Sequence, residues 1–281
     1  MQVRERIRAA AEGLTASERK LAAALLSDYP YPGLASIQDL ARHAEVSAPS
    51  ISRFVTKIGL SGYQEFQREL ISELKEGQRS PVELHKGRRE IEGGYLGDFM
   101  ARATRLMADA SSGITDDQFD RVCALLSDPK RELQLIGGRV SHSLALVLAF
   151  HLGQVRSGVQ PLPADVELWP EYLLRQRPGD VLVVIDFRRY QPSLLKLSMA
   201  AHERGAKIVL MTDKWLSPIA KYAAEVLTVP IETGTLWDTY APALAVVEAV
   251  FTRIAEDNFD QTQSRIQAWD AVRMTDRDTS K

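Results

Sequence analysis

Four short apolar runs in the second half of the chain, separated by segments long enough for helices, set the strongest limit on its fold. The runs cover residues 133–136, 181–185, 207–211 and 226–229. Segments with helical apolar spacing lie at 141–153, 192–204, 217–224 and 240–257. Strands that alternate with helices form a parallel sheet covered on both faces. The sequence therefore predicts a doubly wound α/β domain.

The first part of the chain has a different pattern, in which apolar residues recur at helical spacing up to about Leu74. Two short helices are expected over Ser36–His43 and Ala48–Ile58, joined by the tight connection Ala44–Ser47. A polar, glycine-rich stretch follows and is typical of a linker. We therefore expect four parts: an all-α helix-turn-helix domain over 1–76, a linker over 77–94, the α/β domain over 95–258, and a C-terminal helix with a disordered tail over 259–281.

Composition excludes several kinds of protein. The chain has 35 Lys and Arg against 37 Asp and Glu, so any attraction to nucleic acid has to come from local geometry. Its single cysteine, Cys123, cannot form an internal disulfide or a cysteine-rich zinc site. No apolar run approaches the roughly 18 residues that span a bilayer, and the first residues lack the apolar core of a secretion signal. We expect a cytoplasmic protein with no membrane segment, metal or cofactor.

The second of the two short helices has an apolar face and a polar face. Ile51, Val55 and Ile58 recur at helical spacing, with polar side chains opposite them. A helix anchored in this way can enter the major groove, where an arginine can contact guanine and a lysine can contact phosphate. The residues expected to face DNA are Ser36, Ser47, Ala48, Ser50, Ser52, Arg53 and Lys57. A surface salt bridge is the alternative role for Arg53.

Glycine and hydroxyl residues follow the first predicted strand, where ligands bind in open parallel sheets. Gly137, Gly138 and Ser141 lie at the start of the next helix, and the N-terminus of a helix suits an anionic group. Arg139 adds a positive charge. Glycine after a strand is also ordinary turn chemistry, so this signal alone is weak.

Charged residues follow the second predicted strand. Asp186, Arg188, Arg189 and Tyr190 stand between the strand and the helix that begins near Pro192. The two guanidinium groups can bind a phosphate or a carboxylate, with Tyr190 as a hydrogen-bonding wall. In the alternative, Asp186 simply pairs with Arg188 or Arg189, or an arginine reaches a neighbouring subunit. Thr212 and Asp213 follow the third strand and are expected to shape the edge of the same crevice.

The run Ser36-Ile-Gln-Asp-Leu-Ala-Arg-His-Ala-Glu-Val-Ser47, followed by Pro49–Phe54 and Lys57-Ile-Gly-Leu-Ser-Gly-Tyr63, resembles the N-terminal domain of the RpiR family of bacterial transcription regulators. Phe66 matches the next aromatic position of that family. The likeness covers about residues 1–75. It implies that Ser47, Ser50, Arg53 and Lys57 belong to the side that faces DNA.

The second domain resembles the sugar isomerase (SIS) domain that follows the helix-turn-helix in such regulators. The likeness rests on Gly137-Gly138-x-x-Ser141, the strand 181–185, the run from Arg204 to Asp213, and Ser217-Pro-Ile-Ala220. It implies a phosphosugar ligand, which the family binds with a Ser-x-Ser-Gly-x-Thr loop. Here the loop is Asp186-Phe-Arg-Arg-Tyr-Gln191, so a different anion, a small carboxylate or no ligand at all are alternatives.

These features predict a DNA-binding transcription regulator, a homodimer or homotetramer, whose second domain senses a small anionic metabolite. One alternative is a sugar-phosphate isomerase, which would need a base such as Glu232 or His142. Another is a regulator whose second domain only dimerises, with its crevice plugged by the arginines. The candidate interface residues are Leu144, Leu148, His151, Trp237 and Tyr240, for which the intramolecular core is the favoured alternative. A weak helix over Phe259–Met274 is expected to pack on a partner subunit.

Overall fold

The computed structural model describes residues 2–27, 29–77, 80–86 and 93–275, which form two compact units, Met1–Arg79 and Ser80–Lys281. Part of the expected linker (78–79 and 87–92) and nearly all of the expected tail (276–281) lie outside the described residues. The remainder of the linker contains a short helix, α6 (Pro81–Lys86), that the polar composition did not predict.

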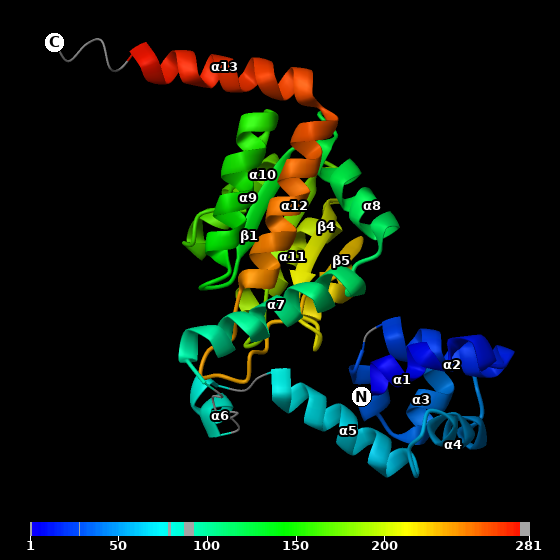
Figure 1. Cartoon of the computed structure of the whole chain (residues 1–281). Coiled ribbons are helices and arrows are strands. Elements are labelled where there is room, and N and C mark those ends of the chain that lie inside the picture. The colour runs from blue at the N-terminus through cyan, green and yellow to red at the C-terminus, as the bar shows by residue number, and fades with distance from the viewer. Residues whose placement is uncertain (1, 28, 78–79, 87–92, 276–281) are drawn as a thin grey trace. The chain divides into compact units, whose positions relative to one another are not determined.

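The first unit is all-α (Figure 1). Its helices are α1 (Val3–Ala9), α2 (Ala16–Ser27), α3 (Ile37–His43), α4 (Ala48–Lys57) and α5 (Tyr63–Gly77), with 3₁₀ turns η1 (Ala11–Gly13) and η2 (Tyr31–Leu34). Ser36 and Ser47 cap α3 and α4, as their hydroxyl oxygens accept hydrogen bonds from the backbone N–H of Asp39 and Ser50. Glu45 makes the turn between these helices at a φ of 52°, in the left-handed region.

The second unit contains a five-stranded parallel sheet in the order β2-β1-β3-β4-β5. The strands are β1 (Leu133–Gly137), β2 (Val159–Pro161), β3 (Val181–Ile185), β4 (Lys207–Thr212) and β5 (Glu225–Thr228). Four of them coincide with the predicted runs. The fifth, β2, pairs at the edge of the sheet and is too short, at three residues, to give a periodic signal.

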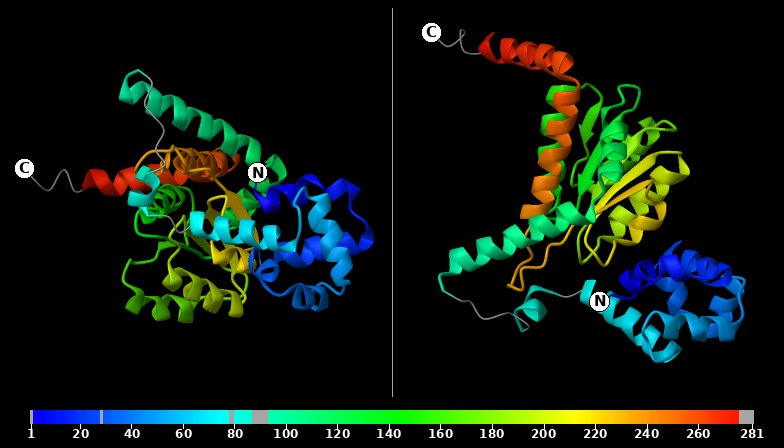
Figure 2. Two further views of the ribbon diagram at one scale, coloured as in Figure 1. Left: turned by 90° about the horizontal axis from the view of Figure 1, so that it is seen from below. Right: turned by 45° about the vertical axis from the view of Figure 1, so that its right-hand side comes forward.

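Helices cover both faces of this sheet (Figure 2). On one face lie α7 (Tyr95–Gly113), α8 (Asp116–Ser127), α9 (His142–Val155) and α12 (Ala241–Asp257). On the other face lie α10 (Trp169–Arg175), α11 (Pro192–Glu203) and the 3₁₀ helix η4 (Pro218–Tyr222). The sequence did not predict α10, and η4 replaces the helix expected over 217–224. The unit is thus the expected doubly wound α/β domain.

The last described helix, α13 (Phe259–Thr275), continues from α12 at an angle and extends past the end of the sheet (Figures 1 and 2). It contacts α9 through the edge-to-face pair Phe150 and Trp269 and through a hydrogen bond from Arg265 Nε to the Gly153 carbonyl. None of the helices in the described ranges is long and apolar enough to cross a membrane.

Candidate functional site

Helix α4 has its apolar face in the core of the first unit and its polar face outside. Ile51, Phe54 and Val55 are completely buried. The residues on the opposite face of the helix are all exposed: Pro49, Ser52, Arg53, Thr56 and Lys57. The core therefore fixes the rotation of α4 about its axis and leaves its polar stripe available to a ligand.

The first turn of α4 presents a small hydroxyl cluster. The Oγ atoms of Ser47 and Ser50 lie 2.8 Å apart, and Arg53 Nη2 lies 3.3 Å from Ser50 Oγ. Ala48 is half-buried beside them. The Arg53 guanidinium thus lies along the start of the helix, where a phosphate oxygen would meet both its charge and the positive end of the helix dipole.

Three of the other expected DNA-facing residues are engaged within the unit. Lys57 Nζ donates to Glu18 Oε2 at 2.7 Å and to the Gly13 carbonyl at 2.6 Å, so it ties the end of α4 to the start of α2. This contact lowers the pKa of Glu18. Ser36 Oγ donates to Asp39 at 2.6 Å, and Ser52 Oγ bonds the Ala48 carbonyl at 3.4 Å. A phosphate contact from Lys57 would have to replace its ion pair.

The glycines and Ser141 meet at the carboxyl ends of β1 and β3, where the strand order reverses. A Cβ on Gly137 would lie 2.5 Å from the Ser141 carbonyl oxygen, so only glycine fits there. A Cβ on Gly138 would lie 3.2 Å from Ser141 Oγ and 3.7 Å from Asp186 Oδ1. Ser141 Oγ donates to the Ile185 carbonyl at 2.7 Å and so joins the two strands. Arg139 beside them is exposed.

Asp186 is buried and does not make the arginine pair that the sequence offered as an alternative. Its Oδ2 accepts a 2.6 Å hydrogen bond from Ser217 Oγ. Its pKa is raised to about 7, chiefly by burial and to a lesser extent by the nearby Asp213, while the hydrogen bond from Ser217 opposes the shift. At neutral pH this carboxyl group is therefore close to half protonated, and its protonated form could donate a hydrogen bond.

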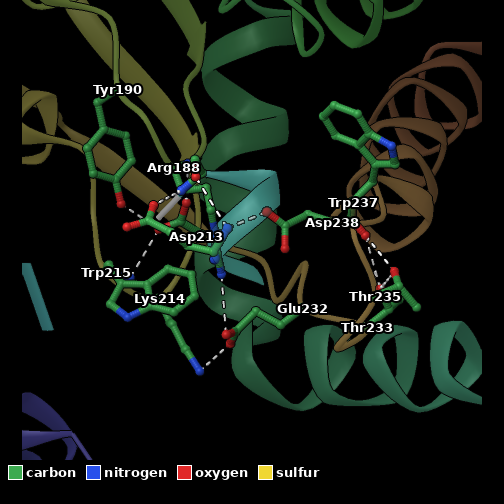
Figure 3. A network of polar contacts seen from close by, with 12 residues as sticks. Arg188, Tyr190, Asp213, Lys214, Trp215, Glu232, Thr233, Thr235, Trp237 and Asp238 are labelled. Atoms are coloured by element: carbon green, nitrogen blue, oxygen red, sulfur yellow. Dashed lines mark hydrogen bonds and ion pairs between the residues drawn. The ribbon is translucent and has the colours of Figure 1, made fainter. Parts of the chain in front are cut away.

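Arg188 folds inward and meets two carboxylates from the loop that follows β5 (Figure 3). Its Nε lies 3.0 Å from Asp238 Oδ2, its Nη2 lies 3.3 Å from Glu232 Oε1, and its guanidinium carbon is 4.0 Å from the centre of the Trp215 ring. Lys214 Nζ also forms an ion pair with Glu232. The side chain of Arg188 is 4% exposed, yet none of its three nitrogens has a well-aligned hydrogen bond among the described residues. The ion pairs are close but misaligned.

Asp213 organises the backbone of the same loop. It is fully buried and accepts hydrogen bonds from the Arg188 N–H at 2.5 Å, the Tyr190 hydroxyl at 2.6 Å and the Trp215 N–H at 3.1 Å. Burial raises its pKa to about 6. Arg189 is exposed and has a φ of 65°. Tyr190 is therefore a partner of Asp213, and of the two loop arginines only Arg188 has a buried side chain.

The sequence pattern did not predict Trp215 or Asp238 as members of this site. Trp215 stands four residues after the end of the run 207–211 and could have been found by the same strand-end rule that selected Asp186. Asp238 carries no such signal, because it lies in an irregular loop. The two candidate bases of an isomerase are both engaged: Glu232 by Arg188 and Lys214, and His142 Nδ1 by the Gly137 N–H at 3.4 Å.

Two domain families match this chain. Residues 1–77 match the rpiR-family helix-turn-helix domain, and residues 125–253 match the SIS domain. The HTH-type transcriptional regulator HexR of Pseudomonas aeruginosa is 27% identical over 240 residues, which are 85% of this chain and 81% of that protein.

Several solved structures share the fold of this chain. The sugar isomerase domain of an RpiR transcription factor from Sphaerobacter thermophilus aligns with a TM-score of 0.58 and 17% identity, over 63% of this chain and 98% of that one. The Vibrio vulnificus NanR protein, in complex with ManNAc-6P, aligns with a TM-score of 0.54 and 18% identity, over 96% of this chain and 98% of that one.

Proposed function

Because this chain belongs to the RpiR family of helix-turn-helix regulators with a SIS domain, we propose that it is a cytoplasmic, DNA-binding transcription regulator and not an enzyme. The observation that carries the proposal is the exposed polar stripe of α4 above a fully buried apolar face. A regulator of this kind binds as a dimer to two half-sites about one duplex turn apart, or a multiple of that distance.

Arg53→Ala tests the DNA-binding part of this proposal. The substitution is expected to weaken binding to the preferred duplex by roughly 10- to 100-fold, since a bidentate arginine–guanine contact contributes about 1–3 kcal/mol of discrimination. The duplex is first selected from a random library with the full-length protein. Affinity is then measured by fluorescence anisotropy at several salt concentrations.

Arg175→Ala is the matched control for Arg53→Ala. It removes the same charge from an exposed position on α10 of the second unit. Equal losses of DNA affinity in the two variants would mean that only the net charge of the protein matters. Equal affinity of the unaltered protein for all duplexes would reject sequence-specific binding.

We further propose that the Arg188 cluster, built from the loops that follow β3, β4 and β5, senses a small anionic metabolite, a sugar phosphate or a carboxylate. The support is Arg188, a buried guanidinium with no aligned hydrogen-bond acceptor among the described residues. An oxyanion could supply two parallel acceptors to such a fork. For the effector to control DNA binding, it must bind one arrangement of the protein more tightly than the other.

Oligomerisation is the remaining part of the proposal, and its support is an exposed apolar patch on α9 and α13. The patch consists of Leu146, Phe150, Ile266, Trp269 and Val272. Leu144 and Leu148, which the sequence offered as interface candidates, are instead buried in the core, and Tyr240 packs against Phe187. Contiguous exposed apolar residues of this kind are typical of protein–protein interfaces.

Phe150→Asp is expected to shift the protein toward monomers by at least tenfold in its dissociation constant, because a carboxylate would be buried without a partner. Sedimentation velocity over a range of concentrations measures this shift. Leu174→Asp is the control, since it places the same charge at another exposed apolar position, on α10. An unchanged dissociation constant for Phe150→Asp would place the interface elsewhere.

A further inference from the structure

The loop after β5, residues 230–240, brings two acidic side chains to Arg188. Glu232 and Asp238 differ in how firmly they are placed: the Asp238 side chain is 12% exposed and that of Glu232 is 35% exposed. The Glu232 carboxylate lies between two cations, with Oε1 near Arg188 and Oε2 paired with Lys214. Two convergent cations around one half-exposed carboxylate form the arrangement that would otherwise bind a free oxyanion.

This loop also lines a cavity of about 420 Å³. Its lining residues are Glu232, Thr233 and Gly234 of the loop and Arg102, Arg105, Leu106 and Asp109 of α7. The volume is within the range of small-molecule sites, which is about 300–1,000 Å³. Glu232 therefore stands at the boundary between the buried Arg188 cluster and a cavity large enough for a small metabolite.

We propose that the Glu232 carboxylate is a tethered competitor that occupies the anion position of this site, and that a phosphate or carboxylate group of the effector displaces it from Arg188 and Lys214. This inference rests on the proposed sensor function of the second unit. The rest of the ligand would lie in the cavity between the 230–240 loop and α7.

The same loop is coupled to α7, the first helix after the expected linker. Arg102 Nη1 donates to the Thr233 carbonyl at 3.0 Å, and Arg102 also pairs with Asp98 at 2.7 Å. Glu232 is the direct neighbour of Thr233 in the chain. When Glu232 is displaced, the Thr233 carbonyl shifts with it, and its hydrogen bond with Arg102 of α7 changes. Occupancy of the anion position is in this way transmitted toward the segment that leads to the DNA-binding unit.

Glu232→Gln tests the tethered competitor, because it removes the charge and keeps the size of the side chain. Calorimetric titration of the full-length protein is done with inorganic phosphate and, separately, with acetate. The variant is expected to bind one of these anions at least tenfold more tightly than the unaltered protein. The anion that gains affinity identifies the effector group as a phosphate or a carboxylate. Glu171→Gln, at an exposed carboxylate paired with Arg175, is the control and is expected to leave the affinity unchanged.

A second substitution, Lys214→Met in the Glu232→Gln background, is expected to remove most of the gain; Lys214 is 41% exposed, so the variant keeps the fold. Hydrogen exchange at the amides of residues 95–105 is expected to rise in Glu232→Gln. Equal anion affinity with and without Glu232→Gln would overturn the tethered competitor, and unchanged exchange in α7 would overturn the coupling. Neither result would bear on sequence-specific DNA binding, which the Arg53→Ala experiment measures separately.

Discussion

Arg156→Met is expected to lower the free energy of unfolding of the second unit by about 3 kcal/mol, since buried acceptors left without a partner cost ~1–3 kcal/mol each. Arg156 is buried at the end of α9 and donates to four backbone carbonyls. Its Nη1 reaches those of Leu126 and Asp128 at 2.9 and 2.7 Å, its Nε reaches that of Ser157 at 2.9 Å, and its Nη2 reaches that of Arg131. The side chain thus closes the end of α8 and the turn into β1.

The measurement for Arg156→Met is urea unfolding followed by tryptophan fluorescence. The four tryptophans are Trp169, Trp215, Trp237 and Trp269, all in the second unit, so the signal reports that unit alone. Arg121→Met is the control, because Arg121 is half exposed and solvent screens its ion pairs with Asp117 and Glu225, so they are expected to contribute little to stability. A similar decrease in the free energy of unfolding in both variants would contradict the structural role of Arg156.

Asp186→Asn is expected to flatten the pH dependence of stability and to make the second unit more stable at pH 8. The pKa of Asp186 is about 7 in the fold against a usual value of 3.8, chiefly because of burial. At a pH between these two values, Asp186 keeps its proton in the folded state and has lost it in the unfolded state. The stabilisation is therefore complete below pH 3.8 and is lost as the pH rises through 7, by on the order of 4 kcal/mol, since the pKa is raised by about 3 units at ~1.4 kcal/mol per unit. Asp213 and Asp238, whose pKa values are raised to about 6, act in the same direction.

Urea unfolding of the unaltered protein and of Asp186→Asn at pH 5 and pH 8 measures this effect. Asparagine resembles the protonated acid in shape and can still accept from Ser217, so the variant is expected to retain the fold. Asp117→Asn, at a side chain that is 85% exposed, is the control and is expected to show the slope of the unaltered protein. If the free energy of unfolding changed equally between pH 5 and pH 8 in all three proteins, Asp186 would be ionised in the folded state at both pH values.

The architecture was largely predictable because its signals are local. Strands buried on both faces of a parallel sheet have to be apolar along their whole length, so β1, β3, β4 and β5 were visible as apolar runs. The rotation of α4 was predictable for the same reason, since burial of Ile51 and Val55 leaves Arg53 only the outer side. The edge strand β2 was missed because three residues are too few to show a periodic pattern.

What the sequence determined by itself is the two-domain order, the fold of each domain, and the gathering of Gly138, Ser141 and Asp186 at adjacent strand ends. Tertiary structure alone decided what each polar side chain contacts there. Arg188 meets Glu232 and Asp238, which lie 44 and 50 residues further along the chain, and not the neighbouring Asp186. The physical reason is that periodicity follows from burial of apolar surface, whereas the partner of a buried charge depends on how irregular loops from distant strands pack together.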